Sequence, residues 1–400
     1  MPKINHAFLK THNSHLVLKT IYEAGAVSRA EIVHRTHLTP PTVSGLVAGL
    51  LETGLVEEIG FGLSRGGKRP ILLRVVDTSR YIIGLDLGRG DFRGGVIDLR
   101  GKVHDRKELP LSTRKGEIAL KMVYELVDDL VQRAASPLPG SPLLGIGIGA
   151  PGLVDHHRGI IHRAVNVEWQ DIPLRSLLYE RYKIPVYMAN DCQIAALAEY
   201  TFGEHVKGNN LAVLNIGYGV GAGIIINGQL MQGLPYGAGE IGHVKIVENG
   251  EPCQCGNTGC LETVASVRAI LRRARALAPE RAALYQYEAA ASPTQAMETM
   301  VDQLAAGDPV IHQVLDETAQ YLAITISHLV SMMGPCRIVI AGNIARLGNP
   351  LVEKIKIALY QRYRLPPVEE TTLEITRFGA DLVLLGGAAL VMPSELGALW

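Results

Sequence analysis

The sequence lacks an excess of charge of either sign, a long apolar run and an even set of cysteines. Lysine plus arginine and aspartate plus glutamate both number 39, so the overall charge indicates no particular partner. The N-terminal stretch MPKINHAFLKTHNSHL has no apolar core typical of a signal peptide, and no uninterrupted apolar run approaches a membrane span in length. With five cysteines, an odd number, we expect a protein of the reducing cytoplasm without membrane insertion.

What is present is the composition of a globular chain that is too long for one ordinary core. Hydrophobic residues make up 47% and charged residues 20% of 400 residues. We therefore expect two or three domains, each large enough to bury an apolar interior.

The first 75 residues are locally basic, with nine lysines and arginines against five glutamates. Apolar residues predict a first helix that ends at Gly25, and Ser28 with Glu31 forms a capping box for a second. Thr39 is placed to cap a third helix, whose apolar stripe runs from Val43 to Leu51. Two short helices joined by a tight turn are typical of a helix-turn-helix, with Thr39, Thr42 and Ser44 near the DNA.

Two predicted strands, residues 55–62 and 70–76, flank the basic segment SRGGKR. This pattern predicts a winged helix-turn-helix over residues 1–76, in which Arg65, Lys68 and Arg69 contact phosphates of double-stranded DNA. The alternative is a three-helix protein-interaction module with a solvated basic loop. The order of helices, cap and basic hairpin favours DNA.

A compact cluster of metal-binding residues lies in GHVKIVENGEPCQCGNTGCLE, residues 242–262. His243, Cys253, Cys255 and Cys260 provide a complete tetrahedral shell for Zn²⁺, and the two glycines between the last cysteines allow a tight turn. Because four protein ligands leave no position open for water, we predict a structural zinc site. The alternative is a set of reduced thiols that are merely buried.

The rest of the chain contains a repeated glycine-rich hairpin. YIIGLDLGRGDFRGGVIDLRGKV predicts two strands and the start of a third, and LAVLNIGYGVGAGIIINGQLMQG repeats the pattern about 130 positions later. Helical segments and further strands alternate with these hairpins. The sequence therefore predicts an α/β protein with two lobes around a ligand cleft. The helix predicted at residues 308–333 is either a subunit contact or, as apolar stripes usually are, part of the second lobe's core.

Several motifs occur together in an order that identifies a family. GAPGLVD, WQDIP, ANDCQIAA, GAGEIGH and the cysteine cluster resemble the ROK family of repressors, open reading frames and sugar kinases. The N-terminal segment makes the chain similar to the regulator branch with the N-acetylglucosamine, glucose and xylose repressors. This resemblance implies an actin-like, RNase H-like sugar kinase fold after the winged helix. Its first lobe would span residues 77–190, completed by about 380–400, and its second lobe residues 191–379.

The resemblance also implies a sugar site and a shared histidine. One nitrogen of His243 would bind zinc, and the other would face a sugar hydroxyl. Carboxylates and amides suit this role because they accept and donate hydrogen bonds to a ring of hydroxyls, although each such residue could instead be a turn or surface residue. The implied sugar-binding residues are Gly152, Asn166, Asn190, Asp191, Glu240, His243 and Glu262.

Two loops decide between a kinase and a sensor. In kinases of this family Asp191 would be the general base for phosphoryl transfer from ATP with Mg²⁺. Here the first phosphate loop reads Asp86-Leu87-Gly88-Arg89-Gly90 and the second Gly217-Tyr218-Gly219-Val220-Gly221, so both lack the threonine hydroxyl of the kinases. Because phosphoryl transfer depends on positioning and charge stabilisation, we expect a regulator without turnover. Weak kinase activity, or ATP binding without catalysis, is the alternative.

The resulting prediction is a sugar-responsive repressor of transcription. A sugar that closes the cleft would change the spacing of paired winged helices, so we expect a homodimer or homotetramer on operator DNA. A sugar-transport protein is a further candidate partner, as known in the family.

Overall fold

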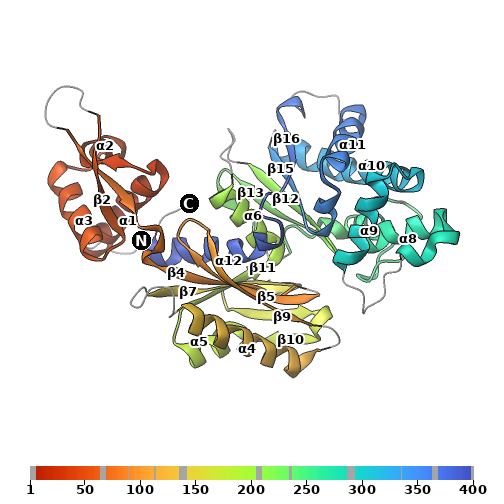
Figure 1. Cartoon of the computed structure of the whole chain (residues 1–400), viewed down its shortest axis with the longest axis horizontal. Coiled ribbons are helices and arrows are strands. Elements are labelled where there is room, and N and C mark those ends of the chain that lie inside the picture. Colours follow the sequence, from red (N-terminus) through yellow and green to blue (C-terminus); the bar gives the residue numbers. More distant parts are fainter. Residues whose placement is uncertain are drawn as a thin grey trace.

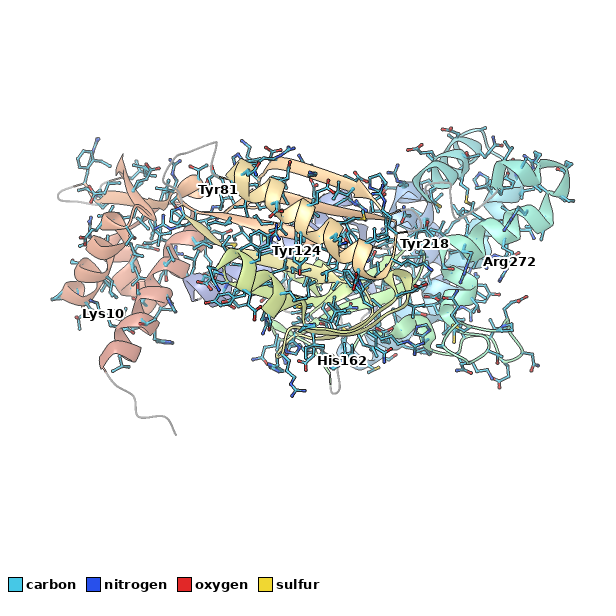
Figure 2. The ribbon with its side chains drawn as sticks, turned by 90° about the horizontal axis from the view of Figure 1, so that it is seen from below. Lys10, Tyr81, Tyr124, His162, Tyr218 and Arg272 are labelled. Atoms are coloured by element: carbon cyan, nitrogen blue, oxygen red, sulfur yellow. The ribbon has the colours of Figure 1, made fainter. Side chains whose placement is uncertain are left out.

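The computed structural model describes residues 6–397, except 64–68, 89, 112–113, 135–141, 204–209, 234–236, 286–292, 335 and 363–367. The molecule is elongated, with a small N-terminal head at one end and two α/β units beyond it (Figure 1). Lys10 marks the head and Arg272 the opposite end (Figure 2).

The head is a three-helix unit with a small antiparallel sheet of order β1-β3-β2. Ser28 caps α2 by accepting a hydrogen bond from Glu31 N, and Thr39 caps α3 by accepting one from Thr42 N, as the sequence predicts. The elements are α1 (His6–Ala24), β1 (Val27–Ser28), α2 (Arg29–Thr36), α3 (Pro40–Glu52), β2 (Val56–Phe61) and β3 (Ile71–Val75). The predicted apolar stripe of α3 is buried in the head's core.

The first α/β unit is built on a five-stranded sheet of order β11-β7-β4-β5-β6. Helix α4 packs on β5 and β6, and α12, close to the C-terminus, packs on β4 and β7. The strands are β4 (Tyr81–Asp86), β5 (Asp91–Asp98), β6 (Val103–Pro110), β7 (Leu143–Ala150) and β11 (Val186–Asn190). The helices are α4 (Gly116–Ala134), α5 (Leu174–Tyr182) and α12 (Leu382–Leu396).

A separate three-stranded sheet, which the sequence did not predict, joins this first unit. Its strands are β8 (Leu153–Asp155), β9 (Ile160–Ala164) and β10 (Trp169–Ile172), all antiparallel. Strand β8 follows Gly152 directly, and the 3-10 turn η2 (Val165–Val167), which holds Asn166, follows β9.

The second α/β unit repeats the first, with a sheet of order β14-β13-β12-β15-β16. In both sheets the glycine-rich hairpin is antiparallel and its first strand also pairs with a later parallel strand, which confirms the predicted duplication. The strands are β12 (Leu211–Ile216), β13 (Val220–Ile226), β14 (Gln229–Leu230), β15 (Arg337–Ala341) and β16 (Thr372–Ile375). The helices are α7 (Leu261–Ala265), α8 (Val267–Leu277), α9 (Pro293–Ala305), α10 (Pro309–Met333) and α11 (Gly348–Arg362).

Two helices lie between the sheets. Helix α6 (Asp191–Phe202) packs on β12 and β13 of the second sheet and against α12, which lies on the first sheet. Helix α12, with the short turn before it, is the one stretch of the described residues that is long and apolar enough to cross a membrane, but ten of its residues are buried between these elements. Helix α10 contributes its buried stripe to the second unit's core, as expected of a core helix. The remaining 3-10 turns are η1 (Asp77–Ser79), η3 (Ile241–His243), η4 (Pro279–Tyr285), η5 (Asn343–Leu347), η6 (Val368–Glu370) and η7 (Gly379–Asp381).

Candidate functional site

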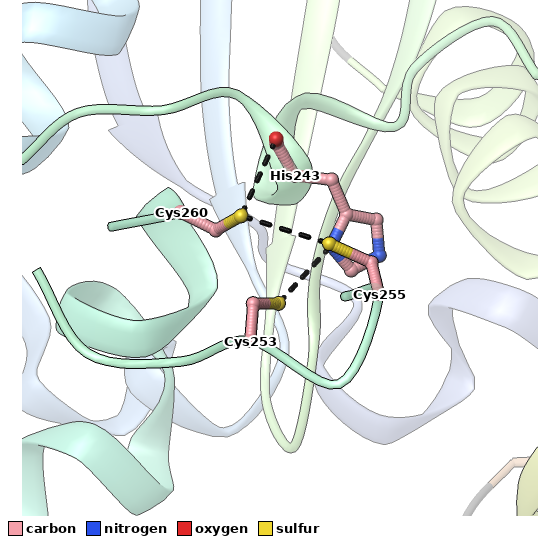
Figure 3. Close-up of side chains that lie close together, drawn as sticks. All are labelled: His243, Cys253, Cys255 and Cys260. Carbon is pink, nitrogen blue, oxygen red and sulfur yellow. Dashed lines mark hydrogen bonds between the residues drawn. The ribbon is translucent and has the colours of Figure 1, made fainter. Parts of the chain in front are cut away.

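Four side chains from the cysteine-rich segment converge on one point (Figure 3). The ligand atoms of His243, Cys253, Cys255 and Cys260 all lie within 4.8 Å of one another. The Sγ of Cys253 is 3.5 Å from His243 Nδ1, and the Sγ atoms of Cys255 and Cys260 are 3.7 Å apart. Three thiols and one imidazole at these separations match the ligand set of a tetrahedral metal site.

Glycines make this convergence possible. Gly259 has a φ of +71°, and a Cβ built on it would lie 1.7 Å from Val247 O, so a side chain does not fit there. Gly256 has a φ of +95°, and its N–H donates to Cys253 O at 3.0 Å, which closes the turn between the first two cysteines. The segment therefore folds back tightly enough to bring its thiols together.

The chemistry of the thiols also fits a cation. Burial raises the pKa of the Cys260 thiol to about 12, and it raises the pKa of Cys253. A hydrogen bond from the Asn257 backbone lowers the pKa of Cys255 instead, so the protein alone favours the neutral thiol at Cys253 and Cys260 only. A metal ion held by these four ligands would supply the positive charge that stabilises the thiolates.

The histidine connects the metal ligands with a carboxylate. His243 Nδ1 faces Cys253, whereas its Nε2 lies 3.8 Å from Glu240 Oε2. Glu240 in turn interacts electrostatically with Cys192 at the start of α6. The ring is thus oriented by one nitrogen and presents the other to a polar surface, as a sugar contact requires.

The start of α6 gathers the next group of predicted residues. Asn190 caps the helix, because its Oδ1 accepts a hydrogen bond of 2.9 Å from Cys192 N, while its Nδ2 donates to Gly152 O at 3.1 Å. Gly152 has a φ of +80°, and a Cβ there would lie 2.1 Å from Arg163 O on β9. Asp191 Oδ1 also accepts from Cys192 N, at 2.8 Å. Gly152, Asn190 and Asp191 are therefore brought together.

Asn166 and Glu262 have different surroundings. The Nδ2 atom of Asn166 is buried and has no hydrogen-bond partner among the described residues, so it is a donor suited to a ligand. Glu262 is 5% exposed, and its Oε2 accepts a hydrogen bond of 3.2 Å from Val220 N. Glu262 thus supports the second glycine loop from the end of the cysteine-rich segment.

The two glycine loops follow β4 and β12. Burial raises the pKa of Asp86 to about 6, Arg93 opposes this shift, and Asp191 adds to it. A Cβ on Gly88 would lie 3.2 Å from Asp86 Oδ1. In the second loop Gly217 N donates to Gly219 O at 2.9 Å, and a Cβ on Gly221 would lie 2.6 Å from Cys192 Sγ. Arg89 lies outside the described residues.

One residue of this region was missed by the sequence interpretation. The side chain of Asn215 hydrogen-bonds Cys192, and a Cβ on Gly342 would lie 2.6 Å from its Oδ1. Asn215 is the single polar residue of the otherwise apolar strand β12. A lone amide at the end of a buried strand, directly before a glycine loop, was the available signal.

The predicted DNA-contacting residues lie on the head. Thr39 and Ser44 are exposed and Thr42 is half-buried, and the hydroxyls of Thr39 and Thr42 are 2.8 Å apart. Arg69 is exposed beside the wing, whereas Arg65 and Lys68 lie outside the described residues. Other arginines of the head are paired with glutamates, namely Arg29 with Glu58, Arg35 with Glu31 and Arg74 with Glu57.

Comparison with known proteins identifies both parts of the chain. Residues 82–393 match the model of the ROK family, and residues 10–58 match that of the MarR family. The chain belongs to the ROK family. Its two glycine loops, the start of α6 and the cysteine cluster all fall within the residues matched by the ROK model.

Similar ROK proteins include regulators and a kinase. A xylose repressor of Caldicellulosiruptor bescii is 33% identical over 98% of both chains. A glucokinase of Halalkalibacterium halodurans is 34% identical, over 80% of this chain and 97% of its own. A crystal structure of a ROK family transcriptional regulator, a homologue of the E. coli MLC protein, superposes with a TM-score of 0.82 at 27% identity, covering 97% of both chains.

Proposed function

We propose that the protein is a sugar-responsive transcriptional repressor that binds operator DNA through its winged helix and a hexose or related sugar at the start of α6. The observation that carries this proposal is the joining, in one chain, of a MarR-like head to a ROK sugar-kinase fold. The xylose repressor from Caldicellulosiruptor bescii matches this chain along nearly its whole length, with 98% of both chains covered. The glucokinase matches only 80% of this chain.

The sugar site consists of the residues gathered around α6. Asn190 and Asp191 supply donors and acceptors at the start of the helix, and Asn166 adds its unsatisfied Nδ2. Glu240, close to Cys192, adds an acceptor, and His243 adds a donor, because a ring that binds the metal through Nδ1 carries its proton on Nε2. A site of this kind rejects analogues that lack one hydroxyl, since a buried polar group would be left without a partner.

Zn²⁺ has a structural role in this proposal. His243, Cys253, Cys255 and Cys260 hold the ion, which fixes the direction of the His243 ring. Glu262 comes two residues after Cys260 and holds Val220, so the ion also stabilises the second glycine loop. Removal of the ion should therefore affect sugar binding before it affects the head.

DNA binding follows from the head's geometry. Helix α3 presents Thr39, Thr42 and Ser44 beside its buried stripe, and Arg65, Lys68 and Arg69 of the wing contact phosphates. Recognition of two half-sites requires two heads, so the working form is a homodimer or homotetramer in the cytoplasm. A sugar-transport protein is a further candidate partner.

A DNA-binding titration tests the proposal. Fluorescence anisotropy of a promoter fragment from the protein's own gene is measured with and without D-xylose, D-glucose or N-acetyl-D-glucosamine. One sugar should change the DNA Kd, and calorimetry with the same sugar should show binding that Asn190→Ala weakens. The repressor proposal is wrong if the protein does not bind any such duplex, or if a bound sugar leaves the DNA Kd unchanged.

A sugar kinase is the second candidate, because Asp191 is present and the glucokinase is 34% identical. In that case Asp191 would accept the proton of the attacking sugar hydroxyl, with ATP and Mg²⁺ as cosubstrate and cofactor. The protein is incubated with ATP, Mg²⁺ and the same sugars, and ADP is measured. Sustained ADP release that Asp191→Asn abolishes would establish the kinase. If no ADP is released, the result supports a regulator whose two glycine loops lack the threonine hydroxyls of the kinases.

A further inference from the structure

The head contacts the first α/β unit at several places, among them Leu144, Leu396 and one hairpin turn. This turn, Leu99–Gly101, joins β5 to β6 and contacts Tyr22 on α1. Tyr22 Oη donates to Leu99 O at 2.8 Å, and Arg100 Nη2 donates to Tyr22 O at 2.9 Å. The guanidinium of Arg100 also lies 3.9 Å from the centre of the Tyr22 ring.

The same turn is rigid and reaches into the head. Asp98, which is 3% exposed, accepts hydrogen bonds from the backbone N–H groups of Arg100 and Lys102 at 2.9 and 3.0 Å. Leu99 is 1% exposed and belongs to the apolar core of the head. Arg100 Nε also lies 3.3 Å from Asp77 Oδ1, in the segment that leaves the head. A displacement of the turn would therefore displace the head with it.

Helix α6 reaches this turn from the sugar site. It begins at Asp191, and its last residue, Phe202, lies against Gly101, where a Cβ would be 2.9 Å from the ring. A helix of this length spans about 18 Å, so the sugar site and the turn lie at opposite ends of one stiff element. Gly101 has a φ of +81°, and the ring fills the space above it.

Helix α6 is anchored to the second sheet. The carboxylate of Glu199 is buried and lies 2.8 Å from Arg337 Nη2 on β15. Its other oxygen accepts a hydrogen bond of 2.6 Å from Oγ1 of Thr376, the residue after β16. A motion of the second sheet relative to the first therefore carries α6 along.

The two duplicated hairpins meet α6 in equivalent ways. Gly101 of the first hairpin lies under Phe202, and Gly228 of the second lies close to Tyr200, where a Cβ would be 2.8 Å from the Tyr200 hydroxyl. The C-terminal turn of α6 is thus held between the turns of both units. Only the first of these turns contacts the head through Tyr22.

We propose that α6 transmits the state of the sugar site to the DNA-binding head through the contact of Phe202 with the Leu99–Gly101 turn. The inference rests on the proposed repressor function and names its coupling residues. Sugar binding at Asn190 and Asp191 shifts α6 with the second sheet, Phe202 moves against Gly101, and the turn reorients α1 through Tyr22. The head's orientation sets the separation of paired recognition helices on the operator.

Phe202→Ala in the full-length protein tests the coupling. The DNA Kd is measured by anisotropy with and without the sugar that alters wild-type binding, and the sugar Kd is measured by calorimetry with and without operator DNA. We expect both single-ligand affinities to stay within about threefold of wild type. The ratio of the DNA Kd with sugar to the DNA Kd without sugar should fall from the usual allosteric range of about 5- to 150-fold to within about twofold of one. By reciprocity, the effect of DNA on the sugar Kd should fall by the same factor.

Tyr200→Ala is the matched control. It also removes an aromatic ring from α6, but this ring faces the turn of the second hairpin at Gly228. It should retain the wild-type ratio. Arg100→Ala provides a second test from the other side of the contact, on a half-exposed turn, and should lower the ratio as Phe202→Ala does. Full retention of the ratio in both Phe202→Ala and Arg100→Ala would overturn the coupling while the repressor function stands. A wild-type protein that binds sugar without any change in its DNA Kd would instead overturn the repressor function, and the coupling with it.

Discussion

The buried carboxylate of Glu262 accepts a hydrogen bond from the backbone N–H of Val220, 42 residues earlier in the chain. Glu262 comes directly after the cysteine cluster, and Val220 lies in the second glycine loop. Gly242, next to His243, approaches the same residue, because a Cβ there would lie 2.0 Å from Val220 O. The cysteine cluster and the glycine loop are therefore one packed unit, in which a change at the cluster reaches the loop.

Cys255→Ser should lower the zinc content and weaken sugar binding. Cys255 is the most exposed ligand of the cluster, so its replacement removes a thiolate with little loss of core packing. Structural sites depend on the complete ligand set, and loss of one thiolate should reduce zinc in the purified protein to well below one equivalent. Mass spectrometry of the metal and calorimetry with sugar measure the two effects.

Cys336→Ser is the control for this experiment, because Cys336 is buried in the core of the second unit and is not one of the four ligands. It should keep its zinc. Without sugar, the full-length protein should bind DNA equally well with or without a chelator. Equal zinc in Cys255→Ser and wild type would refute the metal assignment.

Asp86→Asn should stabilise the protein at neutral pH. Burial raises the folded-state pKa of Asp86 to about 6, despite Arg93 nearby, whereas an unfolded aspartate titrates near 4. The stability contributed by Asp86 is complete below pH 4 and is lost as the pH rises through 6, since the charged form is disfavoured in the fold. Removing the charge should therefore raise the free energy of unfolding by about 2 to 3 kcal/mol at pH 7.5.

Urea unfolding of wild type and Asp86→Asn at pH 4.5 and 7.5 measures this difference. The gain should shrink as the pH falls, because Asp86 is then protonated in the folded wild type. An equal gain at both values would show that Asp86 does not titrate in this range.

Breaking the ion pair that anchors α6 should lower the free energy of unfolding. The side chains of Glu199 and Arg337 are 0% and 10% exposed. Arg337→Met leaves a buried carboxylate without its cation and should destabilise the protein by about 3 to 5 kcal/mol. Adding Glu199→Gln should recover part of the loss, since the uncompensated charge is then gone.

Urea unfolding followed by circular dichroism measures both variants. Arg181→Met is the control, because Arg181 and Asp128 are 50% and 42% exposed and their pair should contribute about 0 to 1 kcal/mol. If Arg337→Met costs no more than Arg181→Met, the buried pair does not anchor α6.

The sequence predicted the features whose determinants lie close together in the chain. Ser28 and Thr39 cap helices within three residues of themselves, and Cys253 to Cys260 form a cluster through local turns. Contacts between distant segments left no such signal. Tyr22 with Leu99, or Phe202 with Gly101, depends on how the sheets and helices pack, which no short-range pattern encodes. The three-stranded sheet β8–β10 was missed because each strand is only three to five residues long.

Replacing basic residues of the wing with alanine should make DNA binding less sensitive to the salt concentration. Arg29, Arg35 and Arg74 are held by glutamates of the head, and we expect basic residues of the wing, among them Lys68 and Arg69, to contact phosphates. Each phosphate contact contributes about 0.9 to the slope of log K against log salt concentration. Lys68→Ala with Arg69→Ala should therefore make the slope shallower by about 1.8 per head and weaken binding to all duplexes alike.

Anisotropy from 50 to 300 mM KCl measures the slope. Arg74→Ala, which removes a cation already paired with Glu57, should leave the slope close to that of wild type; a slope unchanged by the wing substitutions would place the phosphate contacts elsewhere on the head.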